Sequence, residues 1–157
     1  MKSLIEKFNN SFAVIPHDLI ALLARIGIGT TFFRSGLTKI EGFALKSSTF
    51  FLFENDYKLP LVPPEIAAYM GTAAELTMPL LLWSGLLTRF AALSLLIMTL
   101  VIEIFVYPNA FDTHGVWAVC LLYLLKFGPG ALSLDRLIFA DASAPASPMA
   151  ARATGTF

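Results

Sequence analysis

Five ionisable residues lie inside long apolar stretches of this sequence. They are Arg25, Arg34, Glu75, Glu103 and His114. A charged side chain at the centre of a lipid bilayer costs on the order of 2.5–3.5 kcal/mol on insertion scales, so such residues usually face inward, pair and mark a site. We therefore treat the five as a candidate intramembrane polar or ligand site. Their types and spacing assign no catalytic role to any one of them.

The depth of each residue along its helix predicts which of them meet. A helix rises 1.5 Å per residue, which places Arg25 within reach of Glu75 near mid-membrane. Arg34 then lies near the level of Glu103 and His114, towards the outer face. We expect two clusters, Arg25 with Glu75 and Arg34 with Glu103 and His114.

Helical phase separates the two arginines. Arg25 and Arg34 are nine positions apart, and at 100° per residue this puts them on opposite sides of one helix. Lys39 is fourteen positions from Arg25 and shares its face. We therefore expect each arginine to contact a different neighbouring helix.

Glu75 has two informative neighbours on its own helical face. Thr72 precedes it by three positions and Pro79 follows it by four. Because proline has no amide hydrogen, the carbonyl of Glu75 loses its helical partner, and the helix can kink at Pro79. This pattern fits a polar pocket that holds a ligand or proton. It fits a structural salt bridge with a packing kink equally well.

The composition is that of an integral membrane protein with one domain. The chain is 57% hydrophobic and 14% charged, with a mean hydropathy of +0.73, whereas soluble domains are roughly 45–50% apolar and about 25% charged. The formal net charge is zero, which gives no electrostatic case for nucleic acid. Neither His17 nor His114 has a second metal ligand at suitable spacing, so no metal site is expected. No cofactor motif is evident.

Four apolar spans define the expected fold, an all-α transmembrane four-helix bundle with up-down topology. The spans cover about 18–39, 64–83, 89–107 and 109–127. Short links between the last three favour antiparallel neighbours. Together with the segment up to residue 138 they make up the expected membrane domain.

The segments outside the spans are expected to play peripheral roles. Residues 1–17 form an amphipathic segment that lies in the headgroup region or caps the bundle. The long aromatic connection 41–63 predicts a short interfacial helix, capped by Ser47 or Ser48. The Ala-, Ser- and Pro-rich segment 139–157 is expected to be disordered.

Lysines and arginines near the span ends indicate the orientation. If the N-terminus is inside, the inner segments hold the larger set, and both termini are expected in the cytoplasm. The inner set is Lys2, Lys7, Arg89, Lys126, Arg136 and Arg152, and the outer set is Lys39, Lys46 and Lys58.

Three segments in this order resemble one known family. They read ARIGIGTTFFRSGLTKIEGF, AAELTMPLLLWSGLLTRFAAL and GPGALSLDRL, and together they resemble the DoxX family of small bacterial membrane proteins from about Leu19 to Leu137. The resemblance implies a four-helix bundle in the bacterial inner (plasma) membrane. The positions that match the family are Arg25, Arg34, Gly36, Lys39, Glu75, Arg89, Gly130, Ser133, Leu134 and Asp135.

The resemblance leaves three functional hypotheses and does not decide whether the protein is an enzyme. The family takes its name from a subunit of a thiosulfate:quinone oxidoreductase, which favours a redox-associated subunit with quinone as a possible cofactor. The alternative is a non-catalytic anchor or assembly partner for other membrane or periplasmic proteins, acting through the aromatic segment 47–57. A conduit for small solutes or metal ions is a third hypothesis, and it would require oligomers.

Overall fold

The computed structural model describes residues 2–12 and 14–139, and this part of the chain is mostly helical. The segment expected to be disordered lies outside the described residues, apart from Phe139. Four long helices form the main body: α2 (His17–Thr38), α4 (Pro64–Ser84), α5 (Thr88–Val101) and α6 (Phe111–Phe127). Each overlaps one of the four spans expected from the sequence.

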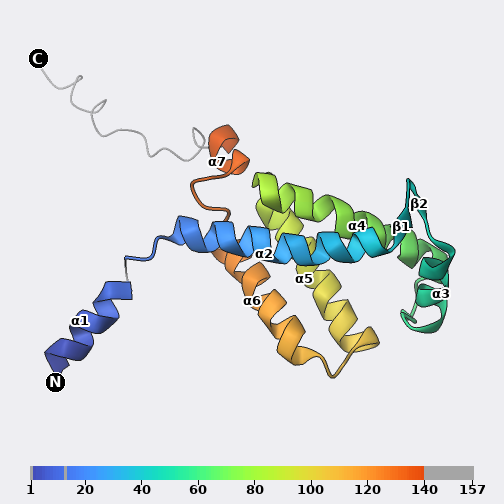
Figure 1. Ribbon diagram of the computed structural model, residues 1–157, viewed down its shortest axis with the longest axis horizontal. Helices are drawn as coiled ribbons and strands as arrows, with labels where there is room; N and C mark the ends of the chain where they lie inside the picture. The colour runs from blue at the N-terminus through green and yellow to red at the C-terminus, as the bar shows by residue number, and fades with distance from the viewer. Residues whose placement is uncertain (1, 13, 140–157) are drawn as a thin grey trace, which may run out of the picture.

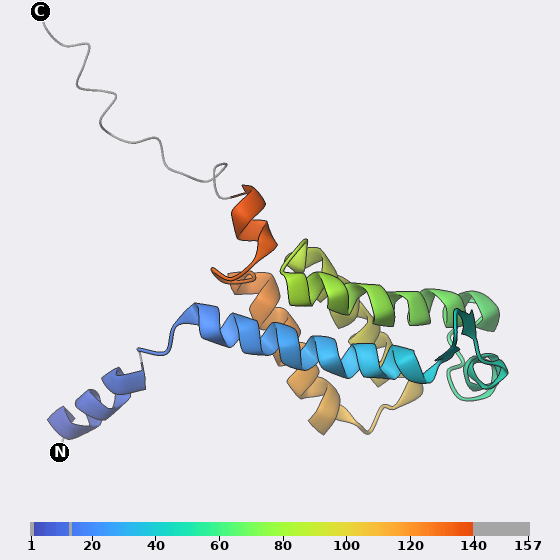
Figure 2. The ribbon, with the colours of Figure 1, turned by 45° about the horizontal axis from the view of Figure 1, so that its top comes forward.

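The long helices pack in a closed order around a shared core. Helix α2 contacts α4 and α6, and α5 contacts the same two helices. Figures 1 and 2 both show α2 and α4 side by side, with α5 and α6 crossing them obliquely. The buried apolar residues between them are Ala21, Ile28, Phe32, Leu82, Ala91, Ala92, Leu95, Leu121 and Leu124.

The outer surface of these helices is apolar. Large hydrophobic side chains such as Leu23, Ile97 and Val119 are exposed on the helices, an arrangement that suits lipid and not water. Three segments are long and apolar enough to cross a membrane, His17–Thr38, Pro64–Ser84 and Thr88–Val106. Helix α6 has 17 residues, fewer than the ~20 that a span needs. Four spans in an up-down bundle therefore stay a prediction.

Residues Ser133 and Asp135 pack against the turn between α4 and α5 and hold it in place. Gly85 adopts a left-handed conformation with φ 68°, and a Cβ there would lie 2.5 Å from Cβ of Ser133. The amide of Asp135 donates to the carbonyl of Gly85, and its carboxylate accepts from the amides of Leu87 and Thr88. Asp135 belongs to α7 (Leu134–Phe139), which thus fixes the turn.

The first connection contains a short hairpin that the sequence did not predict. Strands β1 (Ile40–Glu41) and β2 (Ala44–Leu45) pair antiparallel and lead into α3 (Ser47–Asn55), which packs against α4. The predicted short helix is therefore present. Its predicted serine cap is wrong, since the residue before the helix is Lys46 and no side chain caps the first turn.

Helix α1 (Lys2–Phe12) extends away from the other helices in both views (Figures 1 and 2). Its apolar residues Leu4, Ile5, Phe8 and Phe12 are exposed. Whether this segment lies in the headgroup region or caps the bundle stays a prediction.

Helix α5 does not continue as a regular α-helix to its end. It passes into a π-helical segment, η1 (Ile102–Val106), closed by a hydrogen bond of 2.8 Å from the amide of Tyr107 to the carbonyl of Ile102. A π-helical hydrogen bond spans five residues where an α-helical one spans four, and π-helical segments often occur at functional positions. The segment carries Glu103.

Candidate functional site

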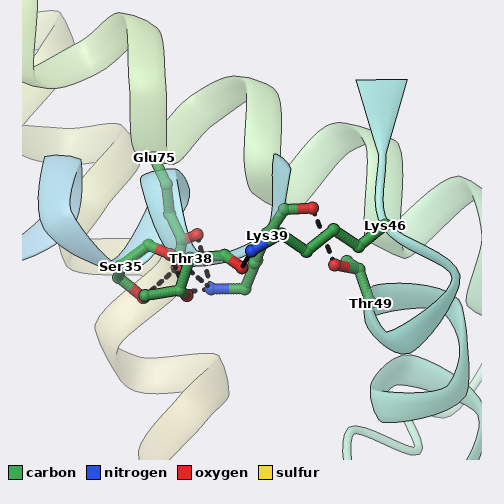
Figure 3. A network of polar contacts seen from close by, with 6 residues as sticks. All are labelled: Ser35, Thr38, Lys39, Lys46, Thr49 and Glu75. Carbon is green, nitrogen blue, oxygen red and sulfur yellow. Dashed lines mark hydrogen bonds and ion pairs between the residues drawn. The ribbon is translucent and has the colours of Figure 1, made fainter. Parts of the chain in front are cut away.

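Glu75 lies buried on α4 and faces the last turns of α2. Nζ of Lys39 lies 2.6 Å from its Oε2, and Oγ of Ser35 donates to its Oε1 at 3.1 Å. Lys39 also donates to Oγ of Ser35 at 3.0 Å. Figure 3 shows the three side chains joined in this way. The side chains of Lys39 and Glu75 are only 6% and 7% exposed, so the structure contains a buried ion pair with a shared hydroxyl.

Sequence spacing explains why these groups meet. Ser35 lies in the last turn of α2, and Lys39 is the residue directly after the helix, still in a helical conformation. The two are four positions apart and therefore share a face. Gly36 lies between them, and a Cβ there would come within 2.8 Å of the Leu76 side chain and 3.1 Å of Cβ of Glu75. The missing side chain allows α2 to approach α4 closely beside the carboxylate.

The first connection supports the same end of α2. The hydroxyl of Thr49 on α3 donates to the carbonyl of Lys39 at 2.8 Å, and Nζ of Lys46 donates to the carbonyl of Thr38 at 2.8 Å. Figure 3 shows both contacts beside the ion pair. The hairpin and α3 therefore fix the backbone that carries Lys39.

Glu75 also lines a cavity of about 290 Å³ between α3, α4 and the α5–η1 helix. The walls are apolar apart from Glu75, Tyr57 and Ser94. Burial raises the pKa of the Tyr57 phenol, and its contact with Tyr107 raises it further. Tyr57 therefore stays protonated at neutral pH. An apolar cavity with a few convergent polar groups is typical of a small-molecule site.

The predicted contact between Arg25 and Glu75 is wrong. Arg25 is only 1% exposed, and its guanidinium donates to backbone carbonyls and not to a carboxylate. The acceptors are the carbonyls of Leu82 at 2.6 Å, Trp83 at 2.9 Å, Pro129 at 2.9 Å and Leu132 at 2.7 Å. The first two belong to the last turn of α4, where the carbonyl of Leu82 also accepts from the amide of Gly85 at 3.1 Å. Arg25 therefore closes a helix end and does not contribute to the Glu75 site.

The predicted outer cluster is half right. Nδ1 of His114 lies 2.6 Å from Oε2 of Glu103, so these two residues meet as expected. The His114 ring also packs on Trp117 with 4.9 Å between centroids. Arg34 is not part of this cluster. Its side chain is exposed, and it forms no hydrogen bond or ion pair with the residues that the structure describes.

Pro79 is buried within α4, which runs as one helix from Pro64 to Ser84. The kink at Pro79 stays a prediction. Thr72 is also buried, and its hydroxyl has no hydrogen-bond partner among the described residues. Whether any of the predicted site residues binds a ligand is likewise a prediction.

Sequence reasoning missed Lys39 and Ser35 as partners of Glu75. One signal could have found them: Lys39 shares a face with Arg25, so a helix that buries one cation towards α4 buries the other in the same direction. The depths along the helix were compared for backbone positions, and Lys39 lies at the end of the span. Its long side chain reaches back along the helix, so its ammonium group lies deeper than its backbone.

The family model that matches this chain is DoxX, over residues 20–108. The chain belongs to the DoxX family. The resemblance read from the sequence is thereby confirmed, and the matched part of this DoxX protein includes Lys39, Glu75 and Glu103 but not His114. A protein of Haemophilus influenzae, described as an uncharacterized protein, is 34% identical over 127 residues, which cover 74% of this chain and 82% of the relative. No solved structure matches the chain.

The family match and the apolar helices together establish that this is a membrane protein. The DoxX protein is a small membrane protein that lies in a lipid bilayer. Its buried Lys39–Glu75 pair, with the adjacent cavity, is the strongest candidate for a site.

Proposed function

We propose that this DoxX protein is a quinone-linked, redox-associated subunit of the bacterial inner membrane. In this proposal α2, α4, α5 and α6 cross the membrane in up-down order with both termini in the cytoplasm. The observation that supports it most directly is the apolar cavity of about 290 Å³ that is lined in part by the buried residue Glu75.

The chemistry of a quinone suits this cavity. A quinone ring is flat and apolar, and its oxygens accept hydrogen bonds when oxidised and donate them as hydroxyls when reduced. The protonated phenol of Tyr57 can donate to a quinone oxygen. The carboxylate of Glu75 can accept from a quinol hydroxyl and take up its proton, while Lys39 stabilises the carboxylate. In this proposal the DoxX protein binds the quinone and transfers protons. A partner redox protein transfers the electrons.

The size and position of the cavity support the same ligand. Its volume is at the lower end of the roughly 300–1,000 Å³ typical of small-molecule sites, which suits a single ring better than a ring with its whole tail. Met70 and Ile97 line the cavity and are also exposed on the outer surface. An isoprenoid tail can leave between them towards the lipid.

The test is whether quinone accompanies and stabilises the protein. Protein extracted from native membranes is analysed by mass spectrometry for bound quinone, and its melting temperature is measured with added ubiquinone or menaquinone. We expect bound quinone and a raised melting temperature, both lost in Glu75→Gln. Glu65→Gln is the matched control, because Glu65 is exposed in the first turn of α4. Wild-type protein with neither bound quinone nor a thermal shift contradicts the proposal.

A second candidate function is assembly of other membrane or periplasmic proteins. It is favoured by the first connection, where Phe43 and Leu61 are fully exposed, at 111% and 102% of reference, and Phe51 is also exposed. In this case Phe43→Ser with Leu61→Ser abolishes function in cells, whereas Glu75→Gln leaves it intact. The reverse pattern excludes it.

A further inference from the structure

A second and larger cavity lies at the other end of the long helices from the Glu75 site. Its volume is about 620 Å³. It is formed where α2 and α5 begin, where α6 ends, and where α7 folds back over them. Figure 1 shows these four ends gathered near the start of α2. The quinone proposal does not use this cavity.

Two arginines line the cavity without a carboxylate partner. Nε of Arg89 donates to the carbonyl of Leu125 at 3.1 Å, which leaves its two terminal nitrogens available. The guanidinium of Arg136 makes no hydrogen bond or ion pair with any described residue. Both side chains are exposed. The cavity therefore offers two cationic groups to an incoming anion.

The two aspartates beside these arginines are already engaged. Oδ1 of Asp18 accepts from the amide of Ala131 at 2.6 Å. The two carboxylate oxygens of Asp135 accept from the amides of Leu87 and Thr88 at 2.7 and 2.9 Å. Their charge is spread over backbone donors, so it offsets the arginines less than a direct salt bridge would.

The rim of the cavity is aromatic and faces outward. Phe90, Phe127 and Phe139 line it, and each is more than half exposed. On α7 the neighbouring side chain of Leu137 is exposed as well. An occupant must therefore combine an anionic group for the two arginines with long apolar chains for the surface beside them.

We propose that this cavity binds the phosphate headgroup of an anionic phospholipid. The phosphate oxygens accept from the guanidinium groups of Arg89 and Arg136, while the acyl chains follow the exposed phenylalanines into the bilayer. Arginine is well suited to this role, since its planar fork of donors matches phosphate geometry. With the proposed orientation, the site faces the cytoplasmic leaflet.

Full-length protein in mixed nanodiscs provides the test. The discs contain phosphatidylglycerol and phosphatidylcholine, and native mass spectrometry measures which lipid stays bound after the disc is removed. We expect enrichment of phosphatidylglycerol on the wild type, roughly fivefold less on Arg136→Gln, and about 25-fold less on the double variant Arg89→Gln with Arg136→Gln. The control is Arg34→Gln with Lys58→Gln, two exposed cations towards the opposite end, which keeps the wild-type enrichment. Equal enrichment on wild type and double variant overturns the proposal.

Free phosphate distinguishes a lipid site from a small-anion site. We expect phosphatidylglycerol to raise the melting temperature of detergent-solubilised protein, and inorganic phosphate at the same concentration to leave it unchanged. An equal rise with inorganic phosphate would overturn the lipid as occupant. Because Glu75 is not involved, Glu75→Gln keeps the lipid response even if the quinone proposal fails.

Discussion

Helix α2 buries two cations on one face, and their surroundings differ in kind. Arg25 is enclosed by backbone carbonyls from the end of α4 and from the segment after α6. Lys39 is paired with the carboxylate of Glu75, which borders an apolar cavity. Both are buried, so burial alone does not distinguish a structural cation from one in a candidate site. The partner and the adjacent space do.

The chemistry of the two side chains matches these surroundings. A guanidinium carries five donors in a rigid plane and never loses its charge in proteins, so it can satisfy several fixed carbonyls at once. An ammonium is a compact charge on a flexible stem, and it pairs well with one carboxylate. We therefore read Arg25 as a permanent link between segments and Lys39 as the group that positions Glu75.

The largest expected effect comes from Arg25→Leu. Leucine leaves the carbonyls of Trp83, Pro129 and Leu132 without donors, and each unsatisfied group costs about 1–3 kcal/mol. We expect a loss of at least about 3 kcal/mol, measured as the free energy of unfolding in mixed micelles. Arg25→Lys should recover only part of it. A variant as stable as wild type would show that these carbonyls find other donors.

The next effect concerns the ion pair. Breaking a buried pair by Glu75→Gln or Lys39→Met should cost about 3–5 kcal/mol for either single change. The double variant should recover much of this loss, because no unpaired charge remains, and a double-mutant cycle measures the recovery. Quinone binding should stay lost in the double variant. Recovery of binding together with stability would make the pair purely structural.

Asp135→Asn tests how α7 supports the end that holds Arg25. The carboxylate accepts from two amides at the start of α5, and loss of such a helix cap costs about 0.5–2 kcal/mol. The expected result is a modest fall in the free energy of unfolding with unchanged quinone binding. A fall in quinone affinity would show that the two ends of the molecule are coupled.

The smallest effect is expected for Arg34→Gln. Arg34 is exposed and has no partner among the described residues, and surface changes of this kind usually alter stability by less than about 0.5 kcal/mol. The melting temperature should therefore match that of the wild type. A large fall in the melting temperature would show that Arg34 contacts a partner chain or lipid. Arg34 would then contribute to stability as Arg25 does.

The sequence was sufficient to locate the long helices, because long apolar runs and short polar links show where each begins and ends. It also located Glu75 correctly as a buried acid and paired Glu103 with His114. It assigned Arg25 to the wrong partner for a physical reason. The partners of Arg25 were sought among acidic side chains, but they are backbone carbonyls. Every residue carries a carbonyl, so the residue types do not show which carbonyls will accept from a buried cation.

Two local features were also beyond a reading of residue types. The hairpin at 40–45 is very short, with two residues in each strand, so it has no alternating pattern long enough to recognise. The π-helical segment at Ile102–Val106 is apolar like the helix before it. Its composition therefore does not distinguish it from the α-helix that it continues.

The carbonyl cage of Arg25 constrains how the protein is made. Its acceptors lie 57, 58, 104 and 107 positions later in the chain, whereas a ribosome delivers segments in order from the N-terminus. During synthesis α2 therefore leaves the translocon with an uncompensated guanidinium, and α4 completes only half of the cage. The nascent chain must stay in a polar or protein-lined setting until the segment around Pro129 emerges. A chain arrested before Pro129 should accordingly be a substrate for membrane proteases, whereas one arrested after Leu132 should persist.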